Sequence, residues 1–132
     1  MNVNHVHTAD NAVPPVDDTE LGGLLEDLAG FHAGIDLIRD GIRLLALDRH
    51  TADRTQTLSA VLAGSTDGTD VLTAIGLLVA RLTNPESNPA LRELTFEQQK
   101  NTQKAGEALV FDLADPDLHQ HAADAAGHIH TD

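Results

Sequence analysis

The sequence predicts an all-α protein: a small bundle of about four helices, the first much the longest, flanked by flexible acidic arms. The main evidence is a run of apolar residues spaced three or four apart, the period that places side chains along one side of a helix. The apolar–polar alternation expected of strands is absent. The apolar run consists of Leu21, Leu24, Leu28, Phe31, Ile35, Ile38, Ile42 and Leu45.

The composition limits the size and chemistry of the protein. The 132 residues suit one domain with a modest core, and aromatic residues make up only 2% of the chain, so the core must be aliphatic. Cysteine is absent, which excludes disulfides, thiolate metal sites and cysteine nucleophiles. We expect a cytoplasmic protein, because the N-terminal segment lacks the cationic start and apolar run of a signal peptide.

The net charge of −13 lies mostly at the two ends of the chain. Residues 1–18 and 112–132 contain aspartate but neither Lys nor Arg. This field repels nucleic acid phosphates and anionic lipids, so we expect neither as a ligand. We also expect no membrane span, because no segment reaches the roughly 18 apolar residues that one needs. The charge serves solubility or suits a basic protein partner.

The first helix is predicted to begin after Thr19, whose side chain suits an N-cap, and to run to about Asp48. Its weak points are Gly30, Gly34 and Gly41, each at a cost of roughly 1 kcal/mol relative to alanine in a helix interior. Either the helix breaks near Gly30, or Gly34 and Gly41 mark a place where another helix approaches closely. Their position beside the apolar run favours close packing over a break.

The next two helices are shorter. One is predicted over about Ala52–Ala63 and ends at a turn cluster, Gly64–Gly68. Thr69 or Asp70 then caps a third helix, which ends before Pro85 because proline disfavours helical geometry in the preceding residue. The apolar face of this helix consists of Val71, Leu72, Ile75, Leu78, Val79 and Leu82.

A fourth helix is predicted from Pro89 to Leu113, with a polar middle that indicates partial exposure. After it, a short helix is expected to begin at Asp115-Pro116 and to end near Gly127. The predicted organisation is an acidic arm, a helical bundle and an acidic, histidine-containing tail, with boundaries at 1–18, 19–114 and 115–132.

The length of the first helix predicts association. Neither short helix is long enough to cover it from end to end, and an exposed aliphatic stripe of that length is an association site. The sequence therefore predicts a homodimer, with the apolar run from Leu21 to Leu45 at its interface.

Six of the eight histidines form His-X-His pairs near the ends of the chain. In an extended segment both rings of such a pair point the same way and can bind one Zn²⁺ or Ni²⁺, whereas on a helix they lie about 200° apart and cannot. The alternatives are polar, disordered ends, or arms whose charge changes with pH near ~6.5. The pairs are His5/His7, His119/His121 and His128/His130.

Two clusters on the first helix suggest a small enzyme or a ligand-binding bundle. His32 and Asp36 are one turn apart, as a general base and its orienting carboxylate would be, although a boundary histidine fits the same pattern. Arg39 and Arg43, followed by further arginines up to Arg54, have the spacing of an anion site or of surface salt bridges. Neither cluster is accompanied by a recognised catalytic or phosphate-binding motif.

The favoured interpretation is an acidic, dimerising, all-helical module for protein–protein interaction or regulation, without catalysis. A metal-binding helical protein that uses the histidine pairs is the first alternative. The small enzyme or ligand-binding bundle is the second.

The metal-binding alternative predicts a response to metal alone. Micromolar Zn²⁺ or Ni²⁺ should shift or broaden the imidazole NMR signals of the histidine pairs, because the ion binds to the lone pair of a ring nitrogen and displaces the proton of a protonated ring. Histidine signals that stay unchanged during the titration would eliminate this alternative.

Overall fold

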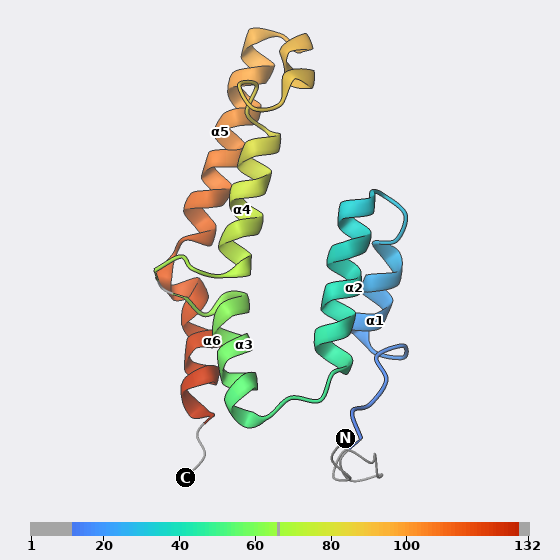
Figure 1. Cartoon of the computed structure of the whole chain (residues 1–132). Coiled ribbons are helices and arrows are strands. Elements are labelled where there is room, and N and C mark those ends of the chain that lie inside the picture. The colour runs from blue at the N-terminus through green and yellow to red at the C-terminus, as the bar shows by residue number, and fades with distance from the viewer. Residues whose placement is uncertain (1–11, 66, 130–132) are drawn as a thin grey trace. The chain divides into compact units, whose positions relative to one another are not determined.

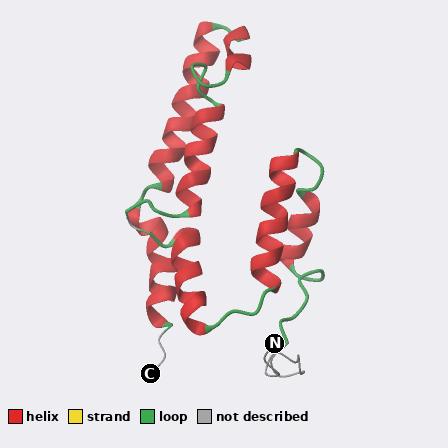
Figure 2. Ribbon diagram, viewed as in Figure 1, coloured by secondary structure: helices red, strands yellow, loops and turns green. Residues whose placement is uncertain are grey.

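The computed structural model describes residues 12–65 and 67–129, which contain helices and loops but no strand (Figure 2). The all-α prediction is confirmed. The chain forms two compact units, Met1–His50 and Thr51–Asp132. None of the described helices is both long and apolar enough to cross a lipid bilayer. In chain order the elements are α1 Glu20–Asp27, α2 Ala33–Leu47, α3 Ala52–Ala63, α4 Val71–Leu82, the 3-10 helix η2 Pro89–Glu93, α5 Phe96–Leu113 and α6 Pro116–His128.

In the first unit, two helices replace the predicted long one. The prediction of a continuous helix from Thr19 to Asp48 is wrong, because Gly30 adopts a left-handed conformation with a φ of 86°. α1 therefore ends at Asp27, and α2 begins at Ala33 and runs back beside α1 (Figure 1). Of the two alternatives for the glycines, the break near Gly30 is the one that forms.

Two side chains at the start of α2 stabilise the turn between these helices. His32 is the N-cap of α2, and its Nδ1 accepts a hydrogen bond of 2.8 Å from the Gly34 amide. Asp36 Oδ1 accepts a hydrogen bond of 3.1 Å from the Gly30 amide. The backbone amides of Gly30 and Gly34 have no hydrogen-bond acceptor within a helix, and these two side chains supply one for each.

α1 packs on α2, and Leu25 of α1 is buried. Arg39 of α2 reaches across to α1, where its Nε donates to the Leu25 carbonyl. Before α1 the chain turns closely over Gly22, where an added Cβ would lie 1.9 Å from the carbonyl oxygen of the buried Val16. The predicted N-cap is confirmed, since Thr19 Oγ1 accepts a 3.1 Å hydrogen bond from the Gly22 amide.

The second unit consists of two antiparallel helix pairs that follow one another end to end. α3 lies beside α6, and α4 lies beside α5 (Figure 1). In the α3–α6 pair, Gln56 Nε2 donates a 2.9 Å hydrogen bond to the Ala126 carbonyl. At the other end of α3, a Cβ on Gly64 would lie 2.9 Å from the Ala123 amide nitrogen, so the two backbones are in close contact there.

Glycines also set the contact between α4 and α5. A Cβ on Gly106 would lie 1.9 Å from Thr83 Oγ1 and 3.3 Å from the Ala80 Cα, and a Cβ on Gly76 would lie 2.8 Å from Leu113 Cδ1. Both glycines are buried. The two helices therefore approach each other at two points where a larger residue would have to displace its neighbours.

The predicted bounds of α3 are confirmed and those of α4 are close, but the prediction for the fourth helix is wrong at its start. Pro89–Glu93 forms the separate 3-10 helix η2, and α5 begins only at Phe96. The cause is a capping box, in which Thr95 Oγ1 accepts from the Gln98 amide and Gln98 Oε1 accepts from the Thr95 amide. α6 continues through Gly127, past its predicted end.

Few apolar side chains are buried in this architecture. Among the described residues, the buried apolar ones are Val16, Leu25 and Ala126. Two packed helices cover only one side of each other, so the remaining apolar side chains face outwards. Those that are more than half exposed are Leu24, Phe31, Leu37, Leu44, Leu77, Leu82, Phe96 and Phe111.

The close contact at Gly106 generates a stability prediction. Replacing Gly106 with Ala should lower the free energy of unfolding by about 1–3 kcal/mol, because the new methyl group overlaps Thr83, a stiff β-branched residue. Urea denaturation followed by circular dichroism measures the change. The matched control is Gly127→Ala, since nothing lies within 4 Å of a Cβ at that position. Equal stability of the two variants would contradict the close packing of α4 on α5.

Candidate functional site

The most completely buried polar group in the described chain is an ion pair between His119 of α6 and Asp70, the N-cap of α4. Their side chains are 1% and 0% exposed, and His119 Nδ1 lies 2.7 Å from Asp70 Oδ2. The same nitrogen lies 3.0 Å from the Ala63 carbonyl, and His119 Nε2 contacts the Leu113 carbonyl. Both ring nitrogens therefore face acceptors.

This geometry requires a protonated imidazole. A carboxylate and two carbonyls only accept hydrogen bonds, so both ring nitrogens of His119 must donate, which only the imidazolium can do. The Leu113 carbonyl raises the pKa of His119 above its ordinary value of 6.5; burial opposes this effect, and the charge of Asp70 adds to it. The site therefore holds a positive charge in its interior.

The carboxylate of Asp70 is held by the backbone as well as by the imidazolium. Its Oδ1 accepts a 2.9 Å hydrogen bond from the Thr73 amide, and its Oδ2 accepts one of 3.1 Å from the Ser65 amide. Burial alone would raise the pKa of Asp70, but these hydrogen bonds and the charge of His119 outweigh burial and lower the pKa from 3.8. Asp70 is consequently charged near neutral pH, and the raised pKa of His119 favours the charged imidazolium beside it.

The helix ends around the ion pair have matching polarity. Ala63 and Leu113 are the last residues of α3 and α5, so the imidazolium lies at two helix C-termini, which carry partial negative charge. Asp70 lies at the N-terminus of α4, which carries partial positive charge. The ion pair thus connects the α3–α6 pair to the α4–α5 pair at the point where one pair ends and the other begins.

With both side chains sealed from solvent and every named atom paired, the His119–Asp70 ion pair has no access to a substrate. Its evident role is to fix the junction between the two helix pairs. Breaking a buried pair by removing one partner leaves an uncompensated charge, which is far more costly than losing a surface salt bridge.

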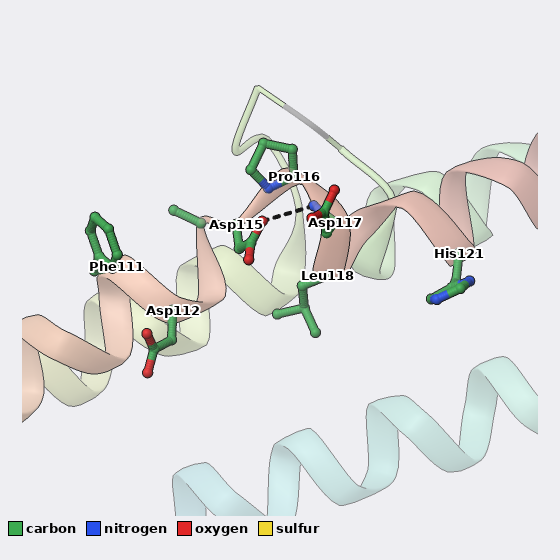
Figure 3. Close-up of a pocket in the computed structure, with 8 residues that line it drawn as sticks. Phe111, Asp112, Asp115, Pro116, Asp117, Leu118 and His121 are labelled. Carbon is green, nitrogen blue, oxygen red and sulfur yellow. Dashed lines mark hydrogen bonds between the residues drawn. The ribbon is translucent and has the colours of Figure 1, made fainter.

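Outside this junction, an open hollow of about 790 Å³ lies at the corner between α5 and α6 (Figure 3). Its acids do not point to a common centre: Asp112 and Asp117 diverge in the close-up, and Asp115 Oδ1 accepts a 3.0 Å hydrogen bond from the Asp117 amide as the N-cap of α6. No metal-competent group of three or more His, Cys, Asp or Glu residues occurs in the described chain. The lining residues are Phe111, Asp112, Ala114, Asp115, Pro116, Asp117, Leu118 and His121.

The structure gives the predicted base and carboxylate separate partners. His32 is exposed and caps α2 through the Gly34 amide, and Asp36 accepts from the Gly30 amide. Asp36 also lies 3.7 Å from Arg39. Each side chain is thereby engaged in stabilising the α1–α2 turn rather than oriented toward the other.

The predicted anion-binding arginines are likewise paired within the first unit. Arg39 Nε donates to the Leu25 carbonyl, and Arg43 lies 3.2 Å from Asp17, on the turn before α1. These contacts correspond to the salt-bridge alternative, because each guanidinium is directed at its own unit.

Of the predicted metal ligands, His5, His7 and His130 lie outside the described residues. His119 and His121 are both on α6, where His119 is buried in the ion pair and His121 is exposed. They therefore do not form a chelating pair in this arrangement. His128 is exposed in the last position of α6.

The predicted interface run is divided by the turn at Gly30. Leu21, Leu24 and Leu28 remain at least partly exposed on or beside α1, and Phe31 is largely exposed in the turn. On α2 the more exposed apolar positions are instead Leu37 and Leu44, which the sequence analysis missed. Their seven-residue spacing, on a side of the helix away from the apolar run, was the signal that could have revealed them.

Comparison with known proteins gives no relative: no protein-family model, curated protein or solved structure compared with the chain shows significant similarity to it.

The ion pair predicts a specific pH dependence of stability. Because the pKa of His119 is raised, its contribution is complete below pH 6.5 and is lost as the pH rises through the folded-state value. Because the pKa of Asp70 is lowered, its contribution is present above pH 3.8 and is lost as the pH falls through the folded-state value. Replacing His119 with Gln should therefore reduce stability most between about pH 4 and 6.5.

Urea unfolding of the wild type and of His119→Gln across this range and up to about pH 9 measures the difference. The matched control is His121→Gln, an exposed histidine on the same helix, whose difference from the wild type should stay small. A stability difference for His119→Gln that is as large at pH 9 as at pH 5 would refute the assignment of a charged pair.

Proposed function

We propose that the protein is a small, acidic, all-helical module for protein–protein interaction or regulation, which acts by association rather than catalysis. It forms a homodimer and presents helix faces and acidic segments to a further protein, in the cytoplasm. The observation that carries this proposal is the large amount of apolar side chain left exposed on helices that have no third layer to cover them.

The architecture of each unit supports association. The first unit holds one helix pair and the second holds two pairs in succession, so every helix has an uncovered side. On α4 the apolar side chains continue around the helix: Ile75, Leu77, Leu78 and Leu82 are all exposed. Covering one such side chain completely contributes about 1.5–3 kcal/mol, so several of them per subunit offset much of the cost of association.

The charge limits the chemistry of the further partner. At a net charge of −13 the chain repels acidic proteins, nucleic acids and anionic membranes, and it attracts basic surfaces. Aspartates are concentrated near the α5–α6 corner, at positions 112, 115 and 117, beside the exposed Phe111. This combination of negative charge and apolar surface supports a basic, partly apolar protein as the partner.

The mass of the full chain in solution tests the proposal. Light scattering after gel filtration at micromolar concentration should give twice the 14.0 kDa of one chain, because dimerisation covers the outward apolar sides. Dilution should shift the equilibrium toward the single chain. A mass of 14.0 kDa at every concentration up to the solubility limit would overturn the proposal.

A further inference from the structure

We propose that the junction between the α3–α6 and α4–α5 helix pairs is a pH-sensitive hinge. Protonated His119 holds the two pairs in a fixed orientation, and loss of its ring proton frees them to move about the turn at Ala114 and Asp115. The hinge belongs to a single chain, so it goes beyond the proposed function and stands whether or not the protein dimerises.

His119 is the side chain that bonds across this junction. It belongs to α6, and its contact with the Ala63 carbonyl stays within the α3–α6 pair. Its other two contacts reach the α4–α5 pair: Nδ1 lies 2.7 Å from Asp70 Oδ2, and Nε2 contacts the Leu113 carbonyl. Each ring nitrogen thus connects one helix pair to the other.

A neutral imidazole cannot keep both of these connections. It has a single N–H, so one ring nitrogen must present a lone pair to an acceptor. If Nδ1 keeps the proton, the Leu113 carbonyl loses its donor from the ring; if Nε2 keeps it, Asp70 and the Ala63 carbonyl lose theirs. In both cases the buried carboxylate of Asp70 also loses the opposite charge that compensates it. Deprotonation therefore always removes at least one connection between the pairs.

Each helix pair also has close contacts that do not include His119. α3 packs chiefly on α6 and α4 chiefly on α5, whereas the contact of α3 with α4 is smaller. The close approach at Gly64 lies within the α3–α6 pair, and the one at Gly106 lies within the α4–α5 pair. Loss of a bond to His119 therefore weakens the connection between the pairs more than it weakens the pairs themselves.

The chain crosses the junction twice where the two helix pairs follow one another end to end (Figure 1). Only Ala114 and Asp115 lie between α5 and α6, so this short connection is the point about which the pairs can turn. A longer loop joins α3 to α4 and can follow such a movement. Residues at the ends of helices commonly absorb the change in backbone direction at a hinge.

Asp70 is the charged group that faces the ring of His119. α3 and α5 present backbone carbonyls to the ring, while Asp67 and Asp115 lie on the neighbouring loops, where backbone amides bind their carboxylates. The charged side chains of α6 and of the end of α5 are exposed: Asp112, Asp117, His121, Asp124 and His128. Proton release by His119 is therefore the event that changes the charge inside the junction.

The direction of the pH dependence follows from the same contacts. The Leu113 carbonyl, followed by the charge of Asp70, raises the pKa of His119 above its ordinary value of 6.5, against the effect of burial. The closed state is consequently complete below pH 6.5, and the hinge opens as the pH rises through the folded-state value.

Opening of the hinge changes the surface beside it. The hollow at the α5–α6 corner is lined from both sides of the turn: Phe111 and Asp112 belong to α5, and Leu118 and His121 belong to α6 (Figure 3). Movement about the turn alters the distance between these two walls. The protonation state of a sealed histidine is thereby coupled to the shape of an exposed surface.

Distances between spin labels test the hinge in the full chain. The chain has no cysteine, so Asp53→Cys and Asn101→Cys place one label on α3 and one on α5, at exposed positions of different helix pairs. Pulsed electron paramagnetic resonance should give one narrow distance distribution at pH 5. As the pH rises above the folded-state pKa of His119, the distribution should become about twice as broad or more, because the pairs then sample several orientations. No broadening at any pH that preserves the helical circular dichroism would overturn the inference.

A second label pair separates movement at the hinge from unfolding. Asp53→Cys with Gln120→Cys places both labels on the α3–α6 pair, again at exposed positions. Its distance distribution should stay the same over the same pH range. Equal broadening for both label pairs would mean that the whole second unit loosens, and the hinge would then be wrong.

Two substitutions test the role of the ring proton. Asp70→Asn keeps a side chain suited to cap α4 but removes the charge that favours the imidazolium, so broadening should begin at a pH lower by about one unit or more. His121→Gln changes an exposed histidine of the same helix and should leave that pH unchanged. An unchanged pH for Asp70→Asn, or an equal shift for both variants, would contradict the assignment of the hinge to His119.

Discussion

Two helices in contact can hide only one side of each, and most features of this protein follow from that constraint. Within its own unit no described helix is enclosed by a third layer, so buried apolar residues are few and leucines are exposed on both units. Stability within the chain consequently depends on local devices: side-chain caps, close glycine contacts and one buried ion pair. Much apolar surface therefore remains uncovered within each unit.

The helical class and most helix positions could be predicted from the sequence, because apolar period, caps and prolines act locally. Thr19 and the bounds of α3 are examples. The first helix was mispredicted because a repeat with spacings of three and four continues unchanged across a tight turn. The only local signal was Gly30. Glycine can either continue a helix or adopt the left-handed conformation that ends it, and Gly30 adopts the second.

The junction in the second unit could not be predicted in the same way. Asp70 was recognisable as a helix cap, but its partner comes from the last helix, and His119 looked like half of a histidine pair. Only the packing of α6 against α3 shows that one histidine of that pair is enclosed and the other is exposed. In the first unit, by contrast, the side chains that resembled a reactive or anion-binding site, among them His32 and Arg43, serve as helix caps and internal salt bridges.

The order of the helices along the chain has a consequence for biosynthesis. α3 is made early, yet the helix that covers it is α6, and the histidine that completes the junction belongs to α6. As the chain leaves the ribosome, α4 and α5 can pair as soon as α5 has emerged. α3 must wait with its apolar side uncovered until α6 emerges, so this interval is when the nascent chain is most exposed to misassembly or to capture by chaperones.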